Sequence, residues 1–181
     1  MSTSVFAALL FALVLVVYVA IAIRTSWRLR GNRVVTCPET GKPVTVTVDV
    51  PHAVTSAVWD RADIRLSSCT RWPERQDCDQ PCACQIEAHP AETEPKTMAS
   101  RFFARRRCAL CQQPIEPLRA MTLQPGFMDP LTQKVQAWDE IRPDLLPEAF
   151  ASWRPLCTNC TLAESFRQKF PERSTDRQPH A

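Results

Sequence analysis

The chain has 181 residues with 22 Lys and Arg against 19 Asp and Glu, so its net charge of +3 is too small to indicate nucleic-acid binding by itself. Only 3 glycines occur, which excludes the usual glycine-rich phosphate loops, and 3 histidines leave little acid–base chemistry near neutral pH. Nine cysteines and 16 prolines instead predict an irregular protein, built from short elements, that depends on its thiols.

An apolar segment at residues 5–23 contains no charge, glycine or proline. At 1.5 Å per residue its 19 residues span about 28 Å, close to the thickness of a bilayer core. A cleavable signal peptide is the alternative interpretation. It needs a basic start and a shorter apolar core, and residues 1–4 carry no basic side chain. We therefore expect a single transmembrane helix, with the lipid bilayer as a partner.

Four arginines follow in a basic juxtamembrane segment, residues 24–34, which contains no acidic side chain. Such a flank is typical of the cytoplasmic side of a membrane. We therefore expect a single-pass protein of the cell inner membrane, with its N-terminus outside and the rest of the chain cytoplasmic. The arginines can also contact anionic lipid headgroups, at ~1 kcal/mol each, or serve as a topology signal alone. They are Arg24, Arg28, Arg30 and Arg33.

The remaining chain is predicted to be a small, irregular α+β, cysteine-rich region with two metal-binding modules. A stretch of low hydrophobicity separates five cysteines from four, which indicates a linker. The expected parts are a cysteine-rich β module at 35–88, the linker at 89–100, a second module at 101–170 and a disordered tail at 171–181.

In the first module, residues 37–42 predict a tight turn in which Gly41 has a positive φ. The Val/Thr alternation over 43–50 predicts a strand, and 64–69 is a candidate partner strand. Four of five thiols could bind one metal here, as zinc or as an iron–sulfur cluster, with Cys84 replacing Cys82 or remaining free. These candidate ligands are Cys37, Cys69, Cys78, Cys82 and Cys84.

The second module contains two CxxC pairs, Cys108 with Cys111 and Cys157 with Cys160, separated by 45 residues. Two such pairs can supply four thiolates to a tetrahedral ion at about 2.3 Å. A reducing cytoplasm argues against structural disulfides, and so does the odd number of cysteines. We therefore predict a zinc site from these four residues, with an iron–sulfur cluster as the alternative.

Three helices are predicted in this module. One follows the second CxxC pair to about residue 170, with Thr158, Asn159 or Thr161 as its cap. A short helix is expected near 147–153. A third is expected to start at Asp129-Pro130, with an apolar stripe formed by Leu131, Val135, Trp138 and Ile141.

A polar turn after Cys108-Ala-Leu-Cys111, followed by a CxxC at a helix start, resembles the treble-clef and zinc-knuckle class of four-cysteine modules. The resemblance covers residues 108–115 and 157–170. Gln112 and Gln113 occupy positions where such knuckles often have glycine. The resemblance implies a fold and a zinc site, and no particular function.

The familiar catalytic motifs are absent from the sequence, so we do not expect an enzyme and find no evident small-molecule substrate. We expect a membrane-anchored protein that binds metal, most simply zinc, and interacts with other proteins: an accessory or scaffold protein docking on a membrane-associated complex. One alternative is an iron–sulfur electron-transfer protein. The other is a membrane-tethered nucleic-acid-binding protein acting through Arg105–Arg107, which the mild charge disfavours.

Overall fold

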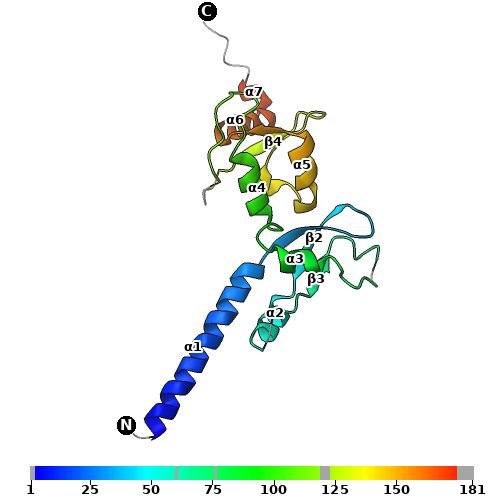
Figure 1. Ribbon diagram of the computed structural model, residues 1–181. Helices are drawn as coiled ribbons and strands as arrows, with labels where there is room; N and C mark the ends of the chain where they lie inside the picture. Colours follow the sequence, from blue (N-terminus) through cyan, green and yellow to red (C-terminus); the bar gives the residue numbers. More distant parts are fainter. Residues whose placement is uncertain (1–2, 60, 76, 119–122, 175–181) are drawn as a thin grey trace, which may run out of the picture. The chain divides into compact units, whose positions relative to one another are not determined.

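The computed structural model describes residues 3–59, 61–75, 77–118 and 123–174 (Figure 1). The chain divides into two compact units, Met1–Glu94 and Pro95–Ala181. The division falls inside the predicted linker at 89–100, but helix α4 (Pro95–Phe103) already begins there. Of the predicted tail, residues 171–174 form helix α7 (Pro171–Ser174), and the remainder lies outside the described residues.

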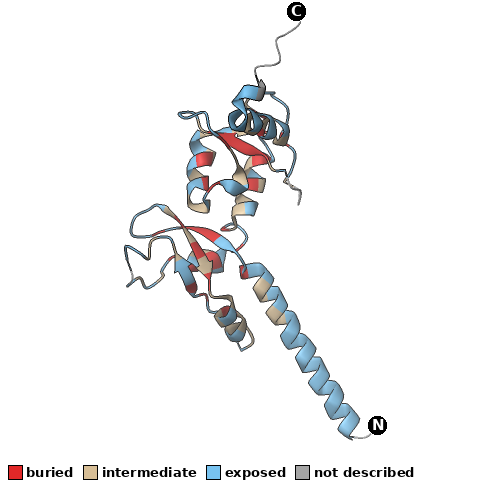
Figure 2. Cartoon of the chain, turned by 180° about the vertical axis from the view of Figure 1, so that it is seen from behind, coloured by how far each residue is buried: buried red, intermediate tan, exposed pale blue. Residues whose placement is uncertain are grey.

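Helix α1 (Thr3–Leu29) contains the predicted apolar segment and continues through Arg24 and Arg28. In the described part of the chain it is the one helix long and apolar enough to cross a membrane. Residues 3–20 are exposed along its length, which is pale blue in Figure 2. Signal sequences near an N-terminus share this length and composition, so the helix alone does not distinguish an anchor from a signal.

The N-terminal unit contains an antiparallel sheet in the order β1-β2-β3, formed by β1 (Asn32–Thr36), β2 (Pro43–Val48) and β3 (Leu66–Cys69). The predicted turn, strand and partner strand are confirmed. Gly41 has a φ of +66°, and the valines of β2 are buried while its threonines are partly exposed. Strand β1 was not predicted, and it begins inside the segment assigned to the membrane flank.

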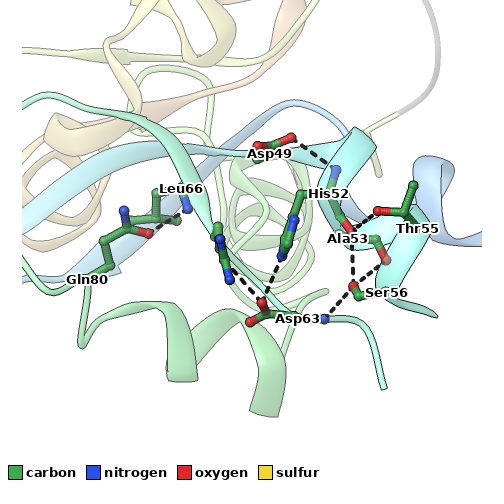
Figure 3. A network of polar contacts seen from close by, with 9 residues as sticks. Asp49, His52, Ala53, Thr55, Ser56, Asp63, Leu66 and Gln80 are labelled. Carbon is green, nitrogen blue, oxygen red and sulfur yellow. Dashed lines mark hydrogen bonds and ion pairs between the residues drawn. The ribbon is translucent and has the colours of Figure 1, made fainter. Parts of the chain in front are cut away.

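Two helices complete this unit, α2 (Val50–Ala57) and α3 (Ala83–Ala88). Asp49 caps α2, because its carboxylate accepts a hydrogen bond from the backbone N–H of His52 at 3.1 Å (Figure 3). Helix α2 contacts α1, and Leu29 at the end of α1 is buried in the same core as Val46 and Ile86. The end of α1 is therefore part of the folded unit.

Arg33 was expected to be one of the basic side chains of the juxtamembrane segment, but in the structure it is buried. It is only 2% exposed, and its guanidinium donates hydrogen bonds to the carbonyl oxygens of Pro90 at 2.6 Å and Arg30 at 3.2 Å, and to that of Arg28. Its backbone N–H lies in β1. Since the last carbonyls of a helix lack partners within the helix, Arg33 stabilises the end of α1.

The C-terminal unit contains an antiparallel sheet in the order β5-β4-β6, formed by β4 (Gly126–Met128), β5 (Val135–Ala137) and β6 (Arg154–Leu156). Short 3-10 turns lie at Trp138–Glu140 and Pro143–Leu145. Helices α4, α5 (Leu146–Ser152) and α6 (Thr158–Lys169) accompany the sheet. Aromatic rings fill the core: the Phe103 and Phe127 centroids lie 5.0 Å apart, and those of Phe102 and Phe150 lie 4.7 Å apart.

The predicted helix starting at Asp129 is wrong, whereas the short helix near 147–153 and the helix after the second CxxC pair are confirmed. Asp129 instead closes a hairpin between β4 and β5. Its carboxylate accepts hydrogen bonds from the Leu131 N–H at 2.9 Å and from the Thr132 hydroxyl at 2.6 Å. Gln133 has a φ of +58°, which stops helical continuation. Leu131, assigned to the apolar stripe, is 91% exposed.

Candidate metal centre

The structure brings the four cysteines of the C-terminal unit together. Their sulfurs all lie within 4.8 Å of one another, and the Cys111 and Cys157 sulfurs are 3.7 Å apart. A disulfide bond is about 2.05 Å long, so this last pair is not bonded. All nine cysteines of the chain lie in the described residues and carry free thiols. The group therefore offers four independent sulfur ligands.

The first CxxC pair sits in a tight knuckle. The Cys108 N–H donates to the Gln113 carbonyl at 2.9 Å, and the Gln112 N–H donates back to the Cys108 carbonyl at 2.9 Å. Arg107 and Pro114 form a β-bridge across its base. Gln112 has a φ of +60°, so it adopts the left-handed conformation usually taken by glycine. The turn forms without glycine, at a modest cost in backbone strain.

The second pair joins a strand to a helix. Strand β6 ends at Leu156, and Cys157 is the N-cap of α6. The cap is therefore not Thr158, Asn159 or Thr161, as predicted. The Thr161 hydroxyl instead donates to the Cys157 carbonyl at 3.0 Å. The Ala109 N–H donates to the Pro155 carbonyl at 2.8 Å and connects the two halves of the site.

The four thiols differ in how readily they ionise. Burial disfavours the Cys108 thiolate, but the N–H groups of Cys111, Cys157 and Leu110 lower its pKa to about 6. Burial and the three neighbouring sulfurs raise the pKa of Cys160, and burial chiefly raises that of Cys157. One anionic sulfur thus forms easily, whereas further ones repel it. A bound cation removes that repulsion, because it attracts every thiolate.

The geometry suits a single tetrahedral ion. Four sulfurs at about 2.3 Å from one ion would lie about 3.8 Å from each other, close to the observed 3.7 Å for Cys111 and Cys157. Cys108 is fully buried, Cys111 is exposed, and the second pair is partly exposed. An ion here would hold the knuckle, β6 and α6 together, which are three separate parts of the C-terminal unit.

The five N-terminal cysteines do not behave alike. Cys37, Cys69, Cys78 and Cys82 line one cavity of about 20 Å³. Cys84 is exposed outside it, with its thiol donating to the Pro81 carbonyl at 3.0 Å. Among the residues that the structure describes, the four C-terminal cysteines alone meet the spacing needed for an ion without movement. The N-terminal four share a cavity but are more widely spaced.

Sequence reasoning missed Arg71, which lies against this cavity. Its guanidinium donates to the Cys37 sulfur at 3.1 Å and to the Glu39 carboxylate at 2.7 Å. Burial opposes ionisation of the Cys37 thiol, but hydrogen bonds from Thr40, Glu39 and Arg71 together outweigh it and lower its pKa to about 7. Burial raises the pKa of the Cys82 thiol to about 11, with a smaller contribution from the nearby sulfurs of Cys69 and Cys78. Nothing in the spacing of Arg71 in the sequence indicates this contact.

The basic run at residues 105–107 has local contacts. The Arg106 guanidinium lies 4.8 Å from the centre of the Phe102 ring, and Arg107 donates to the Gln112 carbonyl at 3.1 Å. Two of the three arginines therefore contact the aromatic core or the knuckle.

No family model, curated protein or solved structure matches this chain. Any statement about function therefore depends on the chain's own residues: a group of cysteines that could hold a metal, and one apolar helix that could span a membrane.

Proposed function

We propose that the protein is a membrane-anchored zinc-binding protein that acts as an accessory or scaffold subunit of a membrane-associated complex. Its proposed role is binding and not catalysis. The observation that carries the metal half of the proposal is the gathering of Cys108, Cys111, Cys157 and Cys160 within 4.8 Å. Four thiolates around one small site, donated by a knuckle and a helix start, are also what a treble-clef module would provide.

The sulfur spacing favours one ion over an iron–sulfur cluster. A cluster places several irons and bridging sulfides between its cysteine ligands, which pushes those ligands further apart than a single ion does. The 3.7 Å between Cys111 and Cys157 fits one tetrahedral centre. Zinc is the common occupant of closed four-cysteine sites of this kind, and it acts there as a structural element.

We further propose a second zinc site in the N-terminal unit, formed by Cys37, Cys69, Cys78 and Cys82. Their shared cavity of about 20 Å³ is large enough for one water-sized occupant. Arg71 supports the choice, since its hydrogen bond to Cys37 resembles those that orient and charge-balance thiolate ligands. The ligands would have to close around the ion, since they are more widely spaced than the four C-terminal cysteines.

Metal content tests both sites. Full-length protein purified anaerobically in detergent should contain two zinc ions and no iron per chain, measured by elemental analysis. Cys78→Ser should lower zinc to one ion per chain, because Cys78 lies in a loop and its loss removes one proposed ligand without opening the core. Cys84→Ser is the matched control and should keep both ions, since the Cys84 thiol points to Pro81.

Iron in excess of zinc would refute the zinc assignment in favour of electron transfer. One zinc ion in the wild-type protein, unchanged by Cys78→Ser, would refute the second site and leave the first intact. Equal losses in Cys78→Ser and Cys84→Ser would show that this choice of four ligands is wrong.

The anchor and its orientation are supported by α1 and the charges after it. Arg24, Arg28 and Arg30 remain exposed at or just beyond its end, although Arg33 is buried. Three cationic side chains next to an apolar helix still favour the cytoplasmic side. We propose that both units face the cytoplasm, where reduced thiols are available to bind metal.

The scaffold half of the proposal is supported by an exposed apolar stripe on α6. Leu162 and Phe166, four residues apart, are 50% and 47% exposed. Phe170 continues the stripe, with its ring centroid 4.9 Å from that of Phe166. The opposite side of α6 is fixed to the unit, because Gln168 accepts from the Val135 N–H and donates to the Gln133 carbonyl. Leu162 and Phe166 thus present exposed apolar surface that could receive a partner protein.

Phe166→Ser should release the protein from its membrane complex. In native gels of mildly solubilised membranes, the wild-type chain should migrate in an assembly larger than its own 20.5 kDa, and the variant mainly as the free chain. The reason is the loss of a large aromatic contact, of the kind that dominates interface energies. Leu131→Ser is the control, since Leu131 is 91% exposed on the hairpin turn. A wild-type protein that migrates alone, or release by both variants, would contradict the docking role.

A further inference from the structure

A second cavity of the N-terminal unit lies where α1 leaves its apolar segment. It has a volume of about 570 Å³, and residues of α1, α3 and the segment 61–64 line it. Three arginines are at its wall, Arg24 and Arg28 of α1 and Arg61 beyond α2, and all three are exposed. Buried apolar side chains of the unit core, including Ile64 and Ile86, form another part of the lining.

The charge of this cavity is positive. Two carboxylates, Asp63 and Glu87, also line it. Asp63 already has partners: its carboxylate accepts a hydrogen bond from His52 Nε2 at 2.8 Å (Figure 3). It also accepts one from Arg65 Nε at 3.1 Å. Its pair with Arg65, which does not line the cavity, offsets its charge. Among the lining residues that the structure describes, three guanidinium groups therefore accompany one carboxylate, that of Glu87, for which no ion pair is formed, so an anion entering the cavity meets a favourable field.

The arginines that α1 contributes to the cavity lie where the headgroup layer of a membrane would be if the apolar segment spans the bilayer. The apolar run ends at Ile23, and Arg24 and Arg28 follow one helical turn apart, about 6 Å along the axis. Helix α2 contacts α1 and leads to Trp59, which is 90% exposed; Trp27 on α1 is 78% exposed. Exposed tryptophans are typical of the membrane–water interface. The N-terminal unit, which carries the cavity, thus has features typical of a unit that contacts a membrane.

We infer that this cavity binds the phosphate of an anionic phospholipid, held by Arg24, Arg28 and Arg61. A guanidinium group can donate two parallel hydrogen bonds to two oxygens of one phosphate. The apolar wall of the cavity would contact the glycerol and the upper acyl carbons of the lipid. The inference rests on the proposed function in one respect, that α1 remains in the bilayer. It adds a lipid ligand and a role for Arg61, which lies far from the membrane flank in the sequence. Free phosphate offers the same chemistry without the chains.

The test uses delipidated full-length protein in a non-ionic detergent, with bound lipid counted by native mass spectrometry. Phosphatidylglycerol should bind one molecule per chain, and phosphatidylcholine with identical acyl chains should bind markedly less. Arg61→Gln should weaken phosphatidylglycerol binding about fivefold, which corresponds to the ~1 kcal/mol expected per arginine near anionic headgroups. Arg61→Lys should lose less, because it keeps the charge. Arg105→Gln, an equal charge change in the other unit, should bind as the wild type does.

Three results would overturn the inference. These are equal binding of the two lipids, equal losses in Arg61→Gln and Arg105→Gln, or displacement of the lipid by inorganic phosphate at an equal concentration, which would assign the site to free phosphate. Failure of the proposed function is separately visible. An intact mass that lacks the residues of α1 would show that the helix is a cleaved signal, before any lipid is added.

Discussion

Cys108→Ser should unfold the C-terminal unit and leave the N-terminal unit folded. Cys108 is fully buried and donates one of the four sulfurs of the site. Zinc binding to small four-ligand modules is worth about 10–16 kcal/mol, whereas a whole domain is stable by about 5–15 kcal/mol. The unit has a sheet of three short strands, so losing the ion removes more free energy than its core supplies.

Hydrogen exchange measured by mass spectrometry would follow both units in the full-length protein. Peptides from β4, β5 and β6 should lose protection in Cys108→Ser, and in wild-type protein treated with a strong zinc chelator. Peptides from β2 should keep theirs in the variant. Cys84→Ser is the control, because Cys84 lies outside both proposed sites. Loss of protection in both units of Cys108→Ser would contradict their independence, and full protection after zinc removal would contradict a structural metal.

The parts of this fold that could be predicted from sequence are those fixed by local patterns. The Val/Thr alternation of residues 43–48 determines which face of β2 is buried, and it does so within one strand. The two CxxC pairs likewise identify four candidate metal ligands from the sequence, because two residues between cysteines are enough to form one tight turn. Leu162 and Phe166 recur at helical spacing and do lie on α6, although on its exposed side.

The hairpin at Asp129 shows where a local pattern misleads. Leu131, Val135 and Trp138 fit a helical stripe, and Asp-Pro is a good helix start. In the structure the Asp129 side chain bonds its own turn, and β5 pairs with β4, whose other edge is occupied by β6 from residues 154–156. The pairing of β4 with β6 joins residues that are distant in the sequence, and a helical window contains no information about it.

The N-terminal cysteines show the same limit. Nothing in the spacing of Cys82 and Cys84 in the sequence indicates which of the two is the better candidate ligand. Helix α3 begins at Ala83, and the turn before it leaves Cys82 buried and Cys84 exposed. Arg71 reaches Cys37 across 34 residues. Choosing four candidate ligands from five therefore required the fold, whereas the five candidates could be named from the sequence.

Arg33→Ala should destabilise the N-terminal unit by about 3–5 kcal/mol. The guanidinium donates to three carbonyls: that of Arg28 in the last turn of α1, that of Arg30 just beyond the helix, and that of Pro90. Each hydrogen bond from a charged group contributes about 1.5–3 kcal/mol, and alanine leaves the buried carbonyl of Pro90 without this donor. The cost of burying the guanidinium, whose Nε has no hydrogen-bond partner in the described part of the chain, offsets part of the sum of the three bonds. Because Arg33 connects α1 to the segment before α4, its loss should loosen the attachment of the apolar helix to the sheet.

Arg30→Ala provides the matched control, since Arg30 is exposed and its carbonyl, not its side chain, accepts from Arg33. Urea denaturation in detergent, followed by hydrogen exchange of β1 and β2 peptides, should show a large loss for Arg33→Ala and less than about 0.5 kcal/mol for Arg30→Ala. Arg33→Lys should fall between them, because an ammonium keeps the charge but cannot reach both sides as the planar guanidinium does. Equal, small effects in Arg33→Ala and Arg30→Ala would mean that Arg33 is only a charge of the membrane flank, as the sequence suggested. A selective loss in Arg33→Ala would instead make this arginine the attachment between the membrane helix and the folded unit.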